Sequence, residues 1–311
     1  MQTPVRIVFH LLLAVFTANA ANKFFISDLD FELTHHFYQN IFAFHGKAPD
    51  QYRILPLLLL KYLWKGLQVI RPGAPWNHAV LLFNFLSAFA VYEVFFLLGT
   101  AWSVRKRLMF NLMFAILFIY TLYTAYRPDT LCSLLICLLT LVVWLRTSAT
   151  AIHLLALTAL AFTRADVALI YGVFWAFYCR KNWTYLLPGI IIPILIQVLL
   201  QKWIFPEAVY YTKPIMFWDN LGGFYLRYNP ATYCIAATIL LFWREISDFI
   251  RGNWKRHWVF FGLFIAYFAL IFVFGRINEY RLYLPFVPLF WVVFHNKSGL
   301  QTFVWKPLTV D

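Results

Sequence analysis

Long apolar runs recur along the whole chain, and they constrain its fold more than any other feature. Examples are "IVFHLLLAVF" near the start, "AVLLFNFLSAFAVYEVFFLL" in the first third and "FGLFIAYFALIFVF" near the end. About 20 consecutive apolar residues suffice for a helix to cross a bilayer. The alternating ten-residue pattern of a membrane barrel strand does not occur in the sequence. The sequence therefore predicts an all-α polytopic integral membrane protein.

The apolar runs predict about ten transmembrane helices within a single transmembrane domain that covers residues 1–311. The predicted spans are 5–21, 77–99, 108–125, 130–145, 150–163, 167–179, 185–204, 230–243, 258–275 and 282–295. Several of them are shorter than the roughly 20 residues of a perpendicular helix. Short helices are tolerated where they line a cavity, so the pair 150–163 and 167–179 indicates a central cavity.

Two longer connections separate the spans, at 22–76 and at 205–229. The first contains the apolar segment 54–70, in which Lys61 and Lys65 lie four residues apart and hence on one helical face. This pattern is typical of an amphipathic helix that lies at the membrane interface. We therefore expect the first loop to carry an interfacial helix.

The composition supports the membrane assignment. Charged residues make up 13% of the chain, against about 25% in ordinary globular proteins. A net charge of +13 is common in membrane proteins that contact anionic lipids, so we expect no nucleic-acid partner. The four cysteines all lie in apolar runs, which favours buried hydrophobic positions over disulfides or a zinc site.

The distribution of basic residues predicts that both termini are cytoplasmic, in an inner or plasma membrane. With that orientation the short inner connections carry ten Lys and Arg and the short outer ones six. A count that includes the long first loop and the termini gives thirteen on each side. The first twenty residues are also compatible with a cleaved signal peptide, because "ANA" before Ala21 resembles a cleavage site.

An acidic cluster directly follows the first predicted span and is the leading candidate for a catalytic site. Asp28, Asp30 and Glu32 lie within a stretch of five residues, and the pair His35 and His36 follows them. The whole chain has only 13 acidic residues. In a helix Asp28 and Glu32 share one face, and in an extended segment all three acids do. Two facing carboxylates can bind a divalent cation or raise the pKa of one member for acid–base work. The alternative is a solvated polar loop.

Arginines and acids also recur in the outer turns that the topology predicts. Some of these residues are candidates for binding a phosphate, and the acids among them are candidates for positioning the arginines. The set is Arg53, Arg127, Asp129, Arg164, Asp166, Arg276, Glu279 and Arg281. Guanidinium groups bind phosphate oxygens bidentately and stay charged. Charges at membrane depth commonly face a cavity or pair with each other. The alternative is that these residues form structural pairs at helix ends.

Two other polar features of the sequence bear on function, an acid inside a predicted span and a pair of histidines. Glu93 lies inside a predicted span, where an acid is by default a functional candidate. It lies near the cytoplasmic end, so pairing with Arg105 or Arg107 is the structural alternative. The chain has one His pair and no second cluster, which argues against a membrane di-iron oxygenase.

The pattern resembles the GT-C superfamily of polytopic glycosyltransferases, which use polyprenyl-phosphate-linked or dolichyl-phosphate-linked sugars. The resemblance rests on the acids after the first span, the basic turn "SVRKR", the outer turn "YRPDT", the junction "FTRADVA" and the late stretch "EYRLYLPFVPLF". The D-x-D-x-E spacing departs from a simple acidic pair. Some members have a large soluble outer domain after the spans, and the sequence shows no such domain here.

The resemblance implies a role for each candidate. Asp28 or Asp30 would deprotonate the acceptor hydroxyl, or would hold a divalent cation such as Mg²⁺ or Mn²⁺ if one is used, and Glu32 belongs to the same set. Arg53, Arg127, Arg164 and Arg281 would bind the carrier phosphate, with Arg276 and Glu279 as weaker candidates. The implied partners are a lipid-linked sugar and membrane lipids.

Three other functions share some of these features. A transporter or flippase for a lipid-linked saccharide would use the same arginines, but it should show inverted repeats with broken helices in both halves. A polymerase-like enzyme would carry its arginines in large late outer loops, whereas here the first loop is the largest. A non-catalytic membrane assembly subunit is the third alternative.

Overall fold

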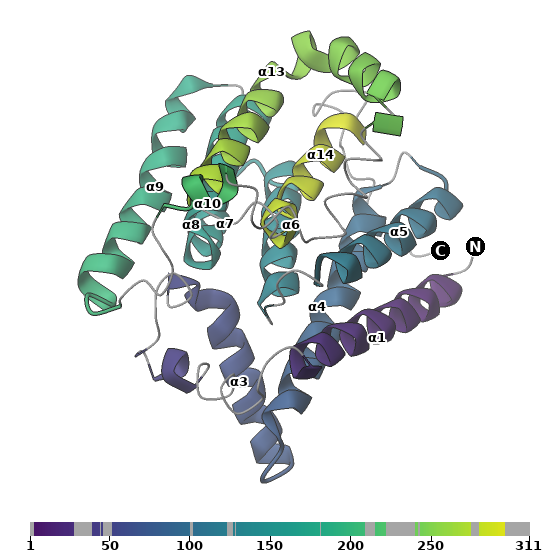
Figure 1. Ribbon diagram of the computed structural model, residues 1–311, viewed down its shortest axis with the longest axis vertical. Coiled ribbons are helices and arrows are strands. Elements are labelled where there is room, and N and C mark those ends of the chain that lie inside the picture. Colours follow the sequence, from purple (N-terminus) through teal and green to yellow (C-terminus); the bar gives the residue numbers. More distant parts are fainter. Residues whose placement is uncertain are drawn as a thin grey trace.

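The computed structural model describes residues 3–27, 39–43, 45, 52–99, 102–122, 127, 129–180, 182–208, 215–221, 240–241, 243–274 and 280–295. Within these ranges the regular elements are helices (Figure 1). They are α1 (Thr3–Ser27), α3 (Ile54–Ile70), α4 (Trp76–Leu98), α5 (Val104–Leu122), α6 (Thr130–Arg146), α7 (Thr150–Thr163), α8 (Ala165–Phe174), η2 (Trp175–Arg180), η3 (Trp183–Tyr185), α9 (Leu186–Leu199), η4 (Leu200–Ile204), α10 (Phe217–Leu221), α13 (Trp243–Phe274), η5 (Tyr280–Tyr283) and α14 (Phe286–His295).

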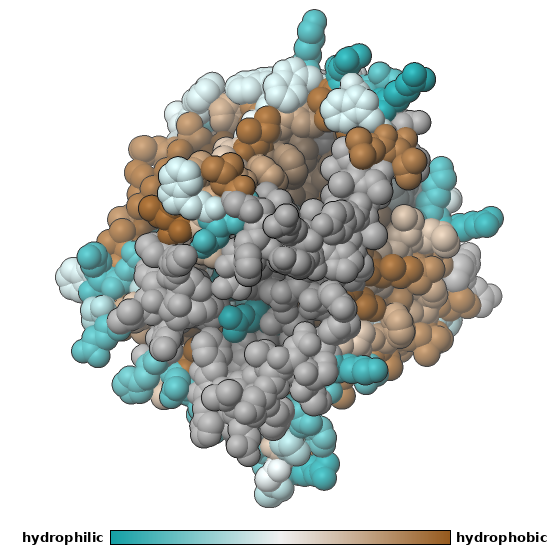
Figure 2. All heavy atoms as spheres, viewed as in Figure 1, coloured by the Kyte–Doolittle hydropathy of each residue, from teal (hydrophilic) through white to brown (hydrophobic). Residues whose placement is uncertain are grey.

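Four segments of the described chain are long and apolar enough to cross a membrane, judged by length and composition. They are Thr3–Lys23, Trp76–Leu98, Trp183–Ile204 and His257–Phe274. Their outer surfaces are apolar, and in Figure 2 hydrophobic side chains gather on the flanks of the molecule while hydrophilic ones concentrate toward its ends. The chain thus has the fold expected of an all-α membrane protein.

The predicted helices are present, but ten spans are more than the described helices support. Segments 54–70 and 150–163 are helices with the predicted bounds. However, α6, α7 and α8 have 17, 14 and 10 residues, and a perpendicular crossing needs about 20. α6 and α8 are mostly buried among other helices, whereas α7 buries five of its 14 residues and exposes Ile152 and Leu155. A count of apolar runs cannot distinguish such burial from lipid contact. The span predicted at 230–243 lies mostly outside the described residues.

The core divides into two packed clusters, and both α6 and α14 contribute buried residues to each. One cluster joins α1, α4, α5 and the start of α6 around fully buried side chains such as Tyr92 and Phe118. The other joins α6, α7, α8, α9, α13 and α14 around Tyr171 and Trp175. Because α6 contributes to both clusters, it fixes their relative position, and the turn that starts it lies where the two halves meet.

Helices α8 and α9 touch through two glycines. A Cβ atom added at Gly172 would lie 2.0 Å from the carbonyl oxygen of Gly189, and one added at Gly189 would lie 2.7 Å from that of Gly172. Small residues let two helix backbones approach closely, which is a common basis of helix packing in membranes. This contact holds α8, and with it the turn that precedes it, against α9.

A polar network joins α1 and α4. His10 is completely buried, and its Nδ1 lies 2.7 Å from Oε1 of Glu93, while Nη2 of Arg6 lies 3.4 Å from Oε2. Glu93 therefore pairs with two residues of the first helix, and the structural alternative of a pair with Arg105 or Arg107 is not the one formed. The first helix could supply these partners because the α1–α4 crossing brings residues 83 positions apart into contact.

The same network continues to α5 and down the α1–α4 interface. Nδ2 of Asn111 donates to the carbonyl oxygen of Tyr92 at 2.9 Å and lies 2.9 Å from Nε2 of His10. An amide nitrogen can only donate, so Nε2 of His10 accepts and its Nδ1–H donates to Glu93. Deeper in the interface the hydroxyl groups of Thr17 and Tyr92 lie 2.6 Å apart.

Candidate functional site

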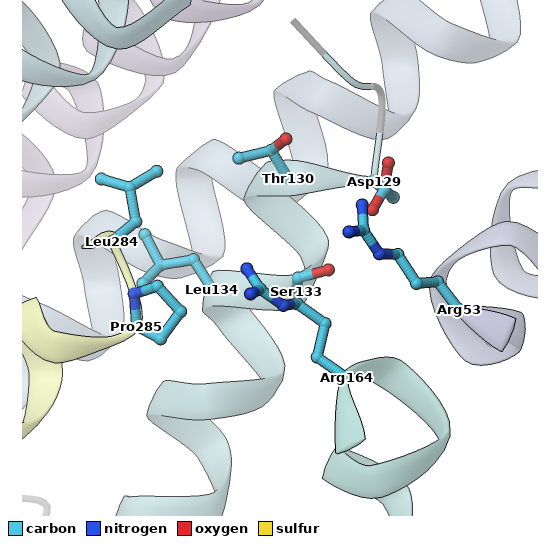
Figure 3. A pocket seen from close by; sticks show the side chains of 8 residues that line it. All are labelled: Arg53, Asp129, Thr130, Ser133, Leu134, Arg164, Leu284 and Pro285. Carbon is cyan, nitrogen blue, oxygen red and sulfur yellow. The ribbon is translucent and has the colours of Figure 1, made fainter. Parts of the chain in front are cut away.

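A small pocket forms where the two core clusters meet, and two arginines line it (Figure 3). Its lining residues are Arg53, Asp129, Thr130, Ser133, Leu134, Arg164, Leu284 and Pro285. They come from the residue before α3, from the start of α6, from the α7–α8 junction and from the turn before α14. The far end of α6 lies about 25 Å away, at a rise of 1.5 Å per residue, so the pocket is at one end of the bundle.

Arg164 is positioned by the two short helices that meet at it. Its backbone is extended, with φ −158° and ψ 103°, so α7 ends and α8 begins at this residue. Its amide donates to Leu160 O at 2.7 Å and its carbonyl accepts from the amide of Ala168 at 2.9 Å. The junction is therefore held by backbone bonds on both sides, and the side chain is left to project into the pocket.

The Arg164 side chain is oriented by an acid and a tyrosine. Nε and Nη2 donate to the two carboxylate oxygens of Asp166 at 3.2 and 2.5 Å, and Nη2 also donates to the Tyr267 hydroxyl at 2.7 Å. That hydroxyl in turn donates to Leu282 O at 3.1 Å. These bonds use Nε and both N–H groups of Nη2, and among the described residues Nη1 makes no hydrogen bond, so the N–H groups of Nη1 can donate to an anion.

The electrostatics of the pair follow from this geometry. Desolvation would raise the pKa of the Asp166 carboxyl, but the adjacent Arg164 guanidinium and its hydrogen bonds, with a smaller effect of Arg53, lower that pKa below its ordinary value. Asp166 is therefore ionised at neutral pH. Its side chain is 49% exposed, so solvent screens the interaction and the pair serves mainly to orient Arg164.

The opposite wall of the pocket is formed by Arg53 and the first turn of α6. The Asp129 side chain is only 5% exposed, and Figure 3 shows the Arg53 guanidinium pointing toward it. One turn further along α6, the Ser133 hydroxyl is buried without a hydrogen-bond partner in the described structure. A buried hydroxyl of this kind usually has a partner, so Ser133 is a candidate contact for a bound polar group.

The pocket is too small for a sugar phosphate as it stands. Its volume of about 20 Å³ exceeds the roughly 10–15 Å³ that one water needs. Ligand sites are usually about 300–1,000 Å³. A ligand that reaches both arginines must therefore separate Arg53 from Asp129 or shift the turn that contains Leu284 and Pro285.

The predicted site residues fall into three groups. Arg53, Asp129 and Arg164 line the pocket, and Asp166 binds Arg164 beside it. Arg127 lies in the turn before α6 without lining the pocket, and Arg281 belongs to η5, where only its backbone is described. Outside the described residues lie Asp28, Asp30, Glu32, Arg276 and Glu279.

The proposed metal ligands Asp28 and Asp30 are in that last group. In the part of the chain that the structure describes, no three His, Cys, Asp or Glu side chains are close enough to hold a metal ion. The described pocket offers anion-binding groups, and the predicted cation site at Asp28 and Asp30 stays a prediction.

Sequence reasoning missed Thr130, Ser133 and Tyr267. The first two are polar residues three apart at the start of an apolar helix, directly after Asp129, so their shared face with that acid was a usable signal. Tyr267 stands alone in the apolar run of α13, and nothing local distinguishes it from a packing residue. Its role follows only from the contact of α13 with α8.

Comparisons with known proteins give no relative: no protein-family model matches the chain, and neither a curated protein nor a solved structure matches it.

Proposed function

We propose that this chain is a membrane glycosyltransferase that moves a sugar from a lipid-phosphate carrier to an acceptor at the outer face of the membrane. The observation that supports it best is the convergence of Arg53 and Arg164, 111 positions apart in the sequence, on one pocket at the end of an apolar helix bundle. Two guanidinium groups at that position suit the phosphate of a lipid whose tail lies along the helices.

The neighbours of the arginines fit the same role. Asp166 and Tyr267 hold Arg164 by three hydrogen bonds, which use Nε and Nη2 and leave the N–H groups of Nη1 for a ligand. A positioned cation stabilises charge that develops on a leaving phosphate, which is electrostatic catalysis. The base that deprotonates the acceptor is assigned to Asp28 or Asp30 of the first loop, by the resemblance to GT-C enzymes.

The proposal includes the membrane topology and the helix arrangement that the resemblance to GT-C enzymes implies. The N-terminus is cytoplasmic, α3 lies at the outer interface, and the short helices α6, α7 and α8 surround the site as shortened membrane helices. The pocket must enlarge when the donor binds, because its present volume admits only water. Arg53, whose guanidinium points toward Asp129 in Figure 3, would turn to the phosphate instead.

The phosphate role is tested by binding of a polyprenyl phosphate to the full-length protein in lipid nanodiscs. Arg53→Ala should weaken binding about 10- to 100-fold, since a charged hydrogen-bonded pair contributes about 1.5–3 kcal/mol. Arg53→Lys should recover only part of the loss, because ammonium cannot bind bidentately. The matched control is Arg71→Ala, an exposed arginine just after α3. Wild-type affinity of Arg53→Ala would refute the phosphate site.

Catalysis is tested separately with a panel of radiolabelled polyprenyl-phosphate sugars. Asp28→Asn or Asp30→Asn should abolish sugar transfer while leaving carrier binding within twofold of wild type. Full activity of both variants would remove the acidic cluster from the mechanism. If the donor moves across vesicle membranes and no sugar is transferred to an acceptor, the chain is a transporter and not an enzyme.

A further inference from the structure

The long helix α13 consists of two parts that differ in character. Its backbone leaves helical geometry at His257, with φ −125° and ψ 29°. The part after this bend, His257–Phe274, is one of the four candidate membrane spans. The part before it, residues 243–256, crosses the top of the molecule at an angle to the span in Figure 1. Most of its side chains are exposed.

Basic residues form one stripe along this first part. Arg244, Arg251 and Lys255 are exposed, and their spacings of seven and four residues place them on one helical face. Asp248 is exposed close to the same face and offsets one of the three charges. The face therefore carries a net positive charge along about three turns of helix.

A second stripe is apolar and is only partly covered by the protein. Trp243, Ile246, Ile250 and Trp254 follow one another at spacings of three and four residues, which again defines one face. Trp243, Ile250 and Trp254 are 60%, 38% and 44% exposed. At about 100° per residue this face lies roughly 120° from the basic stripe. The helix touches α14 through a different side, where the ring centroids of Phe249 and Phe290 are 6.0 Å apart.

We propose that residues 243–256 form an amphipathic helix that lies in the bilayer interface and binds anionic lipid head groups. The occupant of the exposed apolar stripe is the membrane itself, because the helix continues through a single bend into a membrane span and must lie at the level where that span leaves the bilayer. Tryptophan is enriched at this level, and Lys or Arg beside an apolar stripe is typical of helices on anionic membranes. This inference does not depend on the proposed function.

The position of the helix is tested by collision accessibility of spin labels on the full chain in nanodiscs of phosphatidylcholine and phosphatidylglycerol. Single labels are placed through Ile250→Cys and Trp254→Cys on the apolar stripe, and through Asp248→Cys and Gly252→Cys on the other faces, in a variant whose native cysteines are replaced. A Cβ atom at Gly252 meets no atom within 4 Å. The first two labels should be at least threefold more accessible to oxygen, relative to a water-soluble nickel chelate, than the other two.

Two outcomes would overturn the proposal. Equal nickel accessibility at all four positions would mean that the helix stands in water. Shielding of Ile250→Cys and Trp254→Cys from both reagents would mean that protein covers the stripe.

Lipid selectivity is tested with the native cysteines in place, by native mass spectrometry of lipids retained from mixed micelles. The triple variant Arg244→Gln, Arg251→Gln, Lys255→Gln should retain at least threefold less phosphatidylglycerol than wild type. The matched control removes three exposed charges outside the interfacial helix α3, through Lys23→Gln, Lys106→Gln and Lys202→Gln, and should stay within 1.5-fold. Asp248→Asn should increase retention, a gain that misfolding would not produce. Equal retention in the two triple variants would refute the anionic-lipid site.

Discussion

Replacing Gly172 by alanine tests whether the α8–α9 contact stabilises the fold. The new Cβ would lie 2.0 Å from Gly189 O, and the next two atoms of Gly189 lie at 2.7 and 2.8 Å. Ordinary contact begins at 3.4 Å, so the helices must separate by roughly 1.4 Å at their crossing. A gap of 0.5–1 Å already forfeits a quarter to a half of the dispersion energy of each contact.

The expected cost of this change is about 1–3 kcal/mol, the usual range for an overpacked core. It outweighs the gain of up to about 1 kcal/mol that alanine brings over glycine within a helix. At about 2–4 °C per kcal/mol, the apparent Tm should fall by roughly 2–12 °C. Cys132 and Cys137 are free and buried, so a thiol-reactive fluorophore that reports their exposure on heating gives a suitable assay in detergent.

Gly189→Ala and Gly262→Ala show how the loss of stability depends on the space around each glycine. Gly189→Ala would place its Cβ 2.7 Å from Gly172 O, and so should cost about half as much, whereas a Cβ at Gly262 meets nothing within 4 Å. Gly262→Ala is therefore the control for helix propensity alone. All three should be heated at the same scan rate, because unfolding of membrane proteins is often irreversible. If Gly172→Ala melts no lower than Gly262→Ala, the backbone contact does not stabilise the bundle.

Two further predictions concern the pocket. The pKa of Asp166 is lowered in the folded protein, so the stabilising effect of the Arg164 pair is present above the ordinary Asp pKa of about 3.9 and is lost as the pH falls through the lowered value. The Tm difference between wild type and Asp166→Asn, measured by intrinsic fluorescence, should therefore be constant from pH 7 to pH 5 and shrink below pH 4. Tyr267→Phe keeps the ring but removes hydrogen bonds to Arg164 and Leu282, so it should destabilise the protein by about 1–3 kcal/mol and weaken polyprenyl phosphate binding.

Both predictions have outcomes that would contradict them. A Tm difference for Asp166→Asn that is absent at pH 7, or that grows below pH 4, would contradict the ionised pair. Unchanged stability and binding in Tyr267→Phe would mean that Arg164 is held by Asp166 alone. Tyr62→Phe, at a tyrosine that is 64% exposed, is the control for loss of a hydroxyl.

The helices could be predicted from the sequence because each apolar run is bounded by polar or breaking residues. The bounds of α3 and α7 were predicted to the residue for this reason. The number of spans could not be predicted in the same way, since α8 is apolar mainly through burial and α7 partly so, and hydropathy does not separate burial from lipid contact. Length was the better guide: 14 and 10 residues are too few to cross alone.

The site was predictable only where its residues are close in sequence. Arg164 and Asp166 are two positions apart, and their pairing is a local event. The approach of Arg53 to Asp129 depends on how α3 packs against the bundle, which no local pattern encodes. Glu93 shows the same limit, because its partners are in α1 and not in the nearby basic turn that sequence distance suggested.

The network between α1 and α4 has a consequence for how the chain enters the membrane during synthesis. His10 and Thr17 of α1 find their partners in Glu93 and Tyr92, which are 83 and 75 positions later. At about 5–20 residues per second, synthesis needs roughly 4–17 s to cover that distance. Throughout that interval the His10 ring lacks its later partners, and lipid cannot hydrogen-bond to it, whereas the Thr17 hydroxyl can already donate to Leu13 O within α1. The first helix must therefore stay beside water or another protein until α4 emerges, and it joins the bundle as one half of a pair.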